Sequence, residues 1–321
     1  MKANNFGITA AACAALALIL DSRAASQAAS SGIEICIRTV IPSLFPFFLL
    51  SGYLTGNLQG GAWIAKLFRS SKNTGGILLS GFLGGYPMGA KLTAQQFHSG
   101  GISKEEADRL IMFCSQAGPS FLFGITAGQL GNTRLVWLLW AVTILSALSV
   151  AWLIPEDSEK DVKNIPAKKV TLTQAMNASL RAMAAVCGWV VVFNVLMFFL
   201  NSRFLRFLPG EIQILFCGLL ELTNGCLMLS SVENLQIRFL LAAVMVNFGG
   251  VCVWMQTASV AEGISLKRYL WGKLLQTGFA LLYSLVFYGH TWLMIPLLFL
   301  IFGRILLKSG KSSSIPVKYG V

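Results

Sequence analysis

A glycine-interrupted apolar stretch between residues 75 and 119 constrains the fold of this chain more than any other feature. Its first part, GGILLSGFLGGYPMGA at 75–90, is too short for a straight membrane-spanning helix, yet it is apolar and is followed by Lys91. Unpaired peptide groups are costly in lipid, so non-helical backbone at membrane depth is tolerated only inside protein or beside water. The stretch therefore predicts a half-helix or re-entrant segment that its glycines and Pro87 break, as at the binding sites of transporters.

The composition supports a membrane protein. Hydrophobic residues make up 55% of the 321 positions and charged residues 12%, and the mean hydropathy is +0.68. These values exclude a soluble globular protein. The net charge of +12 comes from basic residues scattered between apolar runs, which is typical of loops facing an anionic leaflet rather than of a nucleic-acid surface. We expect an all-α, polytopic protein of the cell membrane that contacts the lipid bilayer and binds no nucleic acid.

Residue types that carry catalysis or bind metals form no recognisable group in the sequence. The seven cysteines lie mostly inside apolar segments, without a CxxC pair, and neither His98 nor His290 has a neighbour that would make it a ligand or a base. The acids after Ser103 follow a capping pattern, which we prefer over a catalytic pair because no nucleophile accompanies them. We expect no metal, no cofactor and no enzyme activity.

Apolar runs predict the membrane spans. The run 33–54 holds two prolines and predicts a bent helix, and 62–72 predicts a short interfacial helix anchored by Trp63. We expect residues 6–20 to remain as a first helix, with a signal peptide cleaved near Ala25 as the alternative. The other expected spans are 134–153, 182–200, 212–229 with a polar break, 239–253, 269–288 and 292–307.

The parts of the chain on either side of the hydrophilic stretch 155–169 resemble each other. GFLGGYPMG at 81–89 can be aligned with GLLELTNGC at 218–226, and QAGP at 116–119 with NFGG at 247–250. Paired broken segments at matching places point to a membrane site between two repeats. Chance similarity between glycine-rich apolar segments is the alternative. We predict a single integral membrane domain over 1–321, with related, inverted repeats at 24–131 and 173–262, a linker at 155–172, C-terminal helices at 263–308 and a basic tail at 309–321.

The polar side chains inside these segments are the candidate solute-binding residues. They are Tyr86, Lys91, Ser115, Gln116, Glu221, Thr223, Asn224, Asn247 and Gln256, and the expected backbone breaks lie at Gly84, Gly85, Pro87, Gly89, Gly118, Pro119, Gly225, Gly249 and Gly250. Ionisable side chains are expensive in a membrane, so Lys91 and Glu221 need an explanation. They are candidate partners across the interface, with a Lys91 that extends to the membrane surface as the alternative.

Two motifs carry a resemblance to a known family. PSLFPFFLLSGYL at 42–54 and GFLGGYPMGAKLTAQQFHSGGISKEEADRLIMFCSQAGPSFLFG at 81–124 resemble the sporulation integral membrane protein YlbJ family. That family belongs to the larger group with the Gate, or nucleoside-recognition, domain. The resemblance covers about residues 24–131 closely and the second half loosely. It implies a plasma-membrane protein of an endospore-forming bacterium, required for the spore cortex and built on a transporter-like scaffold of two Gate-like repeats.

Two classes of function remain open at this point. In the first, the protein binds or translocates a small polar solute at the repeat interface. In the second, it is a non-transporting scaffold that docks other sporulation membrane proteins, and the polar breaks serve only the fold. The positive-inside tendency places the stretch 155–169 in the cytoplasm, although its four lysines are accompanied by four acids.

Overall fold

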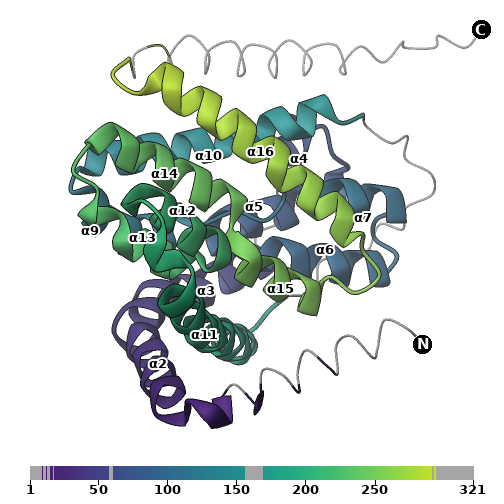
Figure 1. Cartoon of the computed structure of the whole chain (residues 1–321). Helices are drawn as coiled ribbons and strands as arrows, with labels where there is room; N and C mark the ends of the chain where they lie inside the picture. Colours follow the sequence, from purple (N-terminus) through teal and green to yellow (C-terminus); the bar gives the residue numbers. More distant parts are fainter. Residues whose placement is uncertain are drawn as a thin grey trace, which may run out of the picture.

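The chain is an all-α membrane protein (Figure 1). A computed structural model describes residues 9, 12, 15–16, 18–57, 61–155, 169–290 and 293, and within these ranges it contains helices and no strand. In this described part, 5 helices are long and apolar enough to cross a membrane. They are Ser22–Leu54, Thr133–Leu153, Leu172–Arg203, Leu235–Val260 and Leu266–Phe287. The expectation of a polytopic α-helical protein is confirmed.

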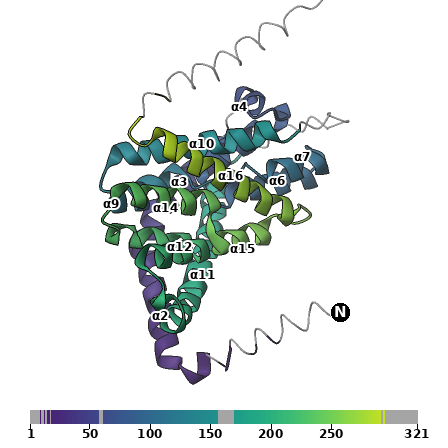
Figure 2. The ribbon, with the colours of Figure 1, turned by 45° about the horizontal axis from the view of Figure 1, so that its top comes forward.

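Two long helices form an arm that projects from the body, at the bottom of Figure 2. The first comprises α2 (Ser22–Ile35), a π-helical turn (Cys36–Val40) and α3 (Ile41–Asn57). It starts before the expected residue 33. The second long helix of the arm is α11 (Leu172–Arg203), and small side chains on α2 let the two helices pack closely. A Cβ added at Gly32 would lie 3.0 Å from the Cα of Val191.

The first half of the body contains short helices and one full span. The short helices are α4 (Ala62–Leu67), α5 (Gly75–Gly84), α6 (Met88–His98), α7 (Lys104–Leu110), α8 (Pro119–Phe121) and α9 (Ala127–Leu130), and the span is α10 (Thr133–Leu153). The N-cap predicted at Ser103 is confirmed, since its hydroxyl accepts a hydrogen bond from the N–H of Glu106 at 3.0 Å, while the carboxylate of Glu106 accepts from the N–H of Ser71 at 3.2 Å. Asp108 accepts one from the N–H of Ser265 at 2.8 Å and thereby ties α7 to the second half.

The second half of the body is built from broken helices and a final span. Its helices are α12 (Gly210–Leu220), α13 (Leu222–Leu227), α14 (Leu235–Phe248), α15 (Gly250–Val260) and α16 (Leu266–Phe287). In Figure 1, α16 runs across the body, and it packs on both α10 and α14. Because α10 precedes residues 155–169 and α14 follows them, α16 joins the two halves.

The helices break at several of the predicted glycines, whereas the breaks expected at Gly89 and Gly225 are wrong, because these residues lie inside α6 and α13. Between α5 and α6, Gly85 has a φ of 77°, and between α14 and α15, Gly249 and Gly250 have φ values of 87° and 82°. Such values are readily adopted only by glycine. Between α12 and α13, Glu221 has extended backbone. Broken helices therefore occur in both halves, whereas the repeat relation between the halves and the membrane depth of the breaks stay predictions.

A non-helical segment, residues 111–118, passes directly against the glycines of α5 and α6. A Cβ added at Gly81 or at Gly89 would collide with the carbonyl oxygen of Cys114. The polar main chain of this segment therefore lies inside the protein, where the absence of side chains on two neighbouring helices makes room for it. This arrangement meets the requirement that irregular backbone at membrane depth be surrounded by protein.

Substitution at Gly81 tests this packing. Gly81→Ala should lower the unfolding free energy by about 1–3 kcal/mol or more, because overpacking against rigid backbone forces the helix and the segment apart. The matched control is Gly76→Ala in the same helix, where an added Cβ meets nothing within 4 Å. Thermal unfolding of the purified variants measures the difference. Equal melting temperatures for the two variants would show that the segment does not pack on α5 in this way.

Several predicted parts lie wholly or mostly outside the described residues. These are the first helix at 6–20, most of the linker 155–172, the span 292–307 and the basic tail 309–321. The cytoplasmic location of the stretch 155–169 likewise stays a prediction.

Candidate functional site

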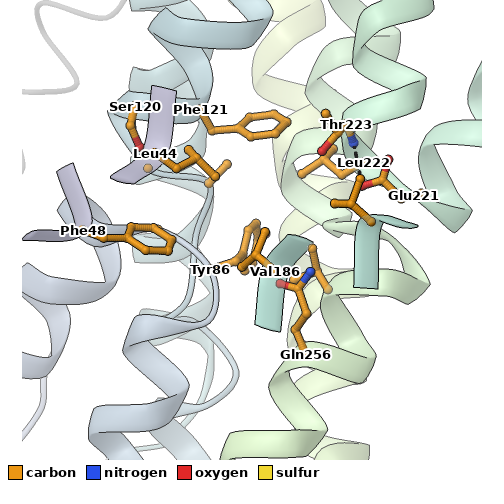
Figure 3. Close-up of a pocket in the computed structure, with 16 residues that line it drawn as sticks. Leu44, Phe48, Tyr86, Ser120, Phe121, Val186, Glu221, Leu222, Thr223 and Gln256 are labelled. Atoms are coloured by element: carbon orange, nitrogen blue, oxygen red, sulfur yellow. Dashed lines mark hydrogen bonds between the residues drawn. The ribbon is translucent and has the colours of Figure 1, made fainter. Parts of the chain in front are cut away.

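The broken helices of the two halves meet around a partly open cavity (Figure 3). Tyr86 and Ser120 line it from the first half, and Glu221, Thr223 and Gln256 line it from the second. Figure 3 shows the side chains of Tyr86, Val186 and Gln256 near its centre, with Phe48 on one side and Glu221 and Thr223 on the other. Apolar side chains complete the wall, namely Leu44, Phe48, Phe121, Val186, Val190, Leu222 and Val253.

The cavity is small in this conformation. Its volume is about 40 Å³. A bound water molecule requires roughly 10–15 Å³ by such a measure, so the cavity has room for on the order of three waters. A solute larger than this can enter only after the surrounding helices move apart. The breaks at Gly85, Glu221 and Gly249 lie where such a movement would bend the chain.

Glu221 lies between α12 and α13, and its carboxylate caps the second helix. The two carboxylate oxygens accept hydrogen bonds from the N–H of Thr223 at 3.0 Å and from the N–H of Asn224 at 2.7 Å. The residue is 2% exposed. Among the ion pairs of the described residues, none involves Glu221. A carboxylate in such a place is held by peptide dipoles rather than by a basic side chain.

The structure does not bring Lys91 and Glu221 together. Lys91 lies within α6, is partly exposed, and makes no ion pair with a described residue. The helix restarts at Met88, so that Tyr86, and not Lys91, occupies the break beside the cavity. The predicted pairing of Lys91 with Glu221 is therefore wrong. A different lysine, Lys273, contacts Tyr86 at the break.

Lys273 is the functional candidate that the sequence analysis missed. It lies on α16, is 1% exposed, and its ammonium donates hydrogen bonds to the hydroxyl of Tyr86, the carbonyl of Ser115 and the side-chain oxygens of Gln116 and Gln276. Gln276 in turn donates to Asn247 at 3.0 Å. Four of the nine predicted residues, Tyr86, Ser115, Gln116 and Asn247, thus gather around a lysine that the sequence analysis placed within an ordinary span.

Tyr86 connects this polar cluster to the cavity. Its hydroxyl accepts from Lys273 at 3.1 Å and donates to the carbonyl of Val246 at 3.2 Å, while the residue also lines the cavity. The hydroxyl thereby links the first-half break to the last turn of α14. A change in the shape of the cavity that displaced Tyr86 would disturb both contacts.

The remaining predicted residues belong to the second half of the site. Thr223 and Gln256 line the cavity, and the amide of Gln256 donates to the sulfur of Cys252 at 3.4 Å.

Asn224 faces a second, more open pocket of about 330 Å³ between the arm and α12–α13. Its side-chain nitrogen is buried and has no hydrogen-bond partner. This pocket shares the first turn of α13 with the cavity beside Tyr86. Other polar side chains that line it are Gln27, Ser31, Asn194 and Asn201.

Comparison with known proteins identifies a curated relative. The sporulation integral membrane protein YlbJ of Bacillus subtilis (strain 168) is 26% identical to this chain, in an alignment that covers 84% of the chain and 79% of that protein. No protein-family model matches the chain. No solved structure matches it either. The similarity confirms the resemblance that the motifs at 42–54 and 81–124 indicated, while the wider relation to the Gate group stays a prediction.

Proposed function

Because the chain is a multi-pass membrane protein related to the sporulation integral membrane protein YlbJ, we propose that it binds a small polar solute during spore formation and moves it across the membrane. The observation that carries the proposal is the small, partly open cavity where broken helices from both halves meet. Polar groups from both halves line it, with Glu221, Thr223 and Gln256 opposite Tyr86 and Ser120. The family resemblance supplies the link to the spore cortex.

The chemistry of the wall favours a solute with hydrogen-bond donors. The hydroxyl of Ser120 is buried and has no hydrogen-bond partner, and Glu221 places a carboxylate in the same wall. Buried polar groups are costly unless they are paired, so a polar occupant would satisfy groups that the protein leaves open. In this description, the small cavity is the occluded state, and opening at the glycine breaks admits the solute.

The small volume is also the observation that favours the second class of function. A non-transporting scaffold needs no cavity, and the same polar groups then serve only to join the broken helices. Such a scaffold would act by docking other membrane proteins of spore formation. The two classes differ in whether a solute binds to the isolated protein.

Thermal unfolding of the purified protein against a panel of nucleosides, sugars and amino acids separates the two classes. A solute that binds only the folded state at about 100 times its Kd stabilises that state by roughly 2.7 kcal/mol. We expect at least one member of the panel to raise the melting temperature of the wild-type protein and to have no effect on Gln256→Leu. Lys91→Ala serves as the control and should retain the shift, because Lys91 does not line the cavity. A panel without any shift would favour the scaffold.

A further inference from the structure

The ammonium group of Lys273 is surrounded by neutral oxygen atoms. Its nitrogen lies 3.1 Å from the hydroxyl of Tyr86, 3.2 Å from Oε1 of Gln116 and 3.0 Å from Oε1 of Gln276, and it also donates to the carbonyl of Ser115. We call these four oxygens the oxygen cage. The ring of Tyr86 adds a further face, with its centroid 4.9 Å from the nitrogen.

The orientation of each oxygen follows from its other partners. The hydroxyl of Tyr86 gives its proton to the carbonyl of Val246, so its lone pairs face Lys273. The amide nitrogen of Gln116 donates to the carbonyl of Phe113 at 2.8 Å, and a carbonyl can only accept. Oxygen Oε1 of Gln116 must therefore be the atom that faces the ammonium.

The same reasoning fixes Gln276. The amide nitrogen of Asn247 donates to the carbonyl of Ala243 at 2.8 Å, so Asn247 presents its oxygen to Gln276. The amide nitrogen of Gln276 donates to that oxygen, and its own oxygen is left to accept from Lys273. Every side chain of the oxygen cage is thus held as an acceptor by a chain of hydrogen bonds that ends on backbone carbonyls.

Four acceptors around one nitrogen suit a charged ammonium, which has three donors and no lone pair. Among the described residues, no carboxylate forms an ion pair with Lys273. The charge is balanced instead by dipoles and by an aromatic ring, which is how membrane ion sites replace the hydration shell of a cation and how proteins hold alkylammonium groups. Lys273 occupies the place of such a cation.

We propose that the oxygen cage is a binding site for a monovalent cation of the ammonium class, and that the side chain of Lys273 is its permanent occupant. The site joins the break at Tyr86, the segment that holds Ser115 and Gln116, and the end of α14 at Asn247. The positive charge that joins these segments is therefore supplied by a side chain of the protein itself, Lys273. This inference does not require the solute proposed for the cavity: Tyr86 lines both sites, but Lys273, Ser115, Gln116 and Gln276 do not line the cavity.

Chemical replacement of the side chain tests the proposal. Lys273→Ala removes three carbons and the ammonium nitrogen, which together correspond to n-propylammonium. We expect the variant to melt below the wild-type protein and n-propylammonium chloride to raise its melting temperature by about 2–4 °C or more. n-Propanol, which has the same length without the charge, and choline chloride, which matches the ionic strength, should not do so. A thiol-reactive dye can report unfolding, since Cys114 and Cys226 are free and buried.

Two further variants make each result decisive. Lys267→Ala removes an exposed lysine of the same helix and should show no response to n-propylammonium. Lys273→Met fills the space with a neutral side chain of similar length, so it should melt below the wild-type protein and also show no response. The proposal is overturned if n-propanol restores Lys273→Ala as well as n-propylammonium does, or if n-propylammonium does not restore it. If Lys273→Ala does not accumulate, Lys273→Met decides, and a wild-type melting temperature for that variant overturns the proposal.

Discussion

Cells that depend on a Glu221→Ala copy of this protein are expected to produce almost no heat-resistant spores, although the protein still accumulates in the membrane. The substitution removes a carboxylate from the cavity wall and leaves the N–H groups of Thr223 and Asn224 without an acceptor. Loss of a helix cap costs about 0.5–2 kcal/mol, which is not enough to unfold a protein of ordinary stability. Spore yield after heating and the amount of protein in isolated membranes are the measurements.

Glu221→Gln separates the charge from the cap. Glutamine keeps one side-chain oxygen that can accept a hydrogen bond from the start of α13, so this variant should melt close to the wild-type temperature and yet remain defective in spore formation. Glu211→Ala, an exposed acid in the first turn of α12, is the control and should sporulate normally. Full spore yield from Glu221→Gln would mean that Glu221 acts only as a helix cap.

Arg109→Ala is expected to prevent stable accumulation of the protein. The guanidinium is 1% exposed and donates hydrogen bonds to the carbonyl of Phe68 at 3.1 Å and to the carbonyl of Ala151 at 2.8 Å, so it ties α7 to the ends of α4 and α10. It also lies 3.8 Å from the buried carboxylate of Glu106. Removing one partner of a buried charge pair costs about 3–5 kcal/mol because the other charge stays uncompensated. Detergent-extracted protein, followed by size-exclusion chromatography, measures the loss.

Glu105→Ala provides the comparison on the same helix, because Glu105 is exposed. It should leave both the yield and the elution profile unchanged. A normal monodisperse peak from Arg109→Ala would contradict the role of this arginine in joining the helices.

The sequence predicted the helix breaks well because glycine patterns state backbone requirements directly. The break before Met88 and the one at Gly249 depend on glycines with positive φ. The break at Glu221 was predicted from polarity within an apolar run. Local signals of this kind depend on neighbouring residues alone, so they can be read without knowing what packs against them.

The lysine that contacts Tyr86, Ser115 and Gln116 could not be predicted from local sequence in the same way. Lys91 stands immediately after the glycine-rich segment, and nearness in sequence favoured it, whereas Lys273 reaches Tyr86 from a position 187 residues away. A weaker signal did exist in α16. Its buried residues lie along one face and include polar ones. They are Tyr269, Gly272, Lys273, Gln276, Ala280, Ser284 and Phe287. A polar stripe at helical spacing within an apolar span indicates a helix whose buried face meets other polar groups.

The late position of α16 in the chain has a consequence for biosynthesis. The carbonyl of Ser115 and the side chain of Gln116 leave the ribosome more than a hundred residues before Lys273, their shared donor. Until that helix enters the bilayer, the early segments hold polar groups that lipid cannot satisfy. A nascent protein truncated before α16 should therefore remain open to water or to a membrane chaperone, and quality-control proteases could distinguish it from the finished protein. The polar interior can therefore close only after α16 has been synthesised and inserted.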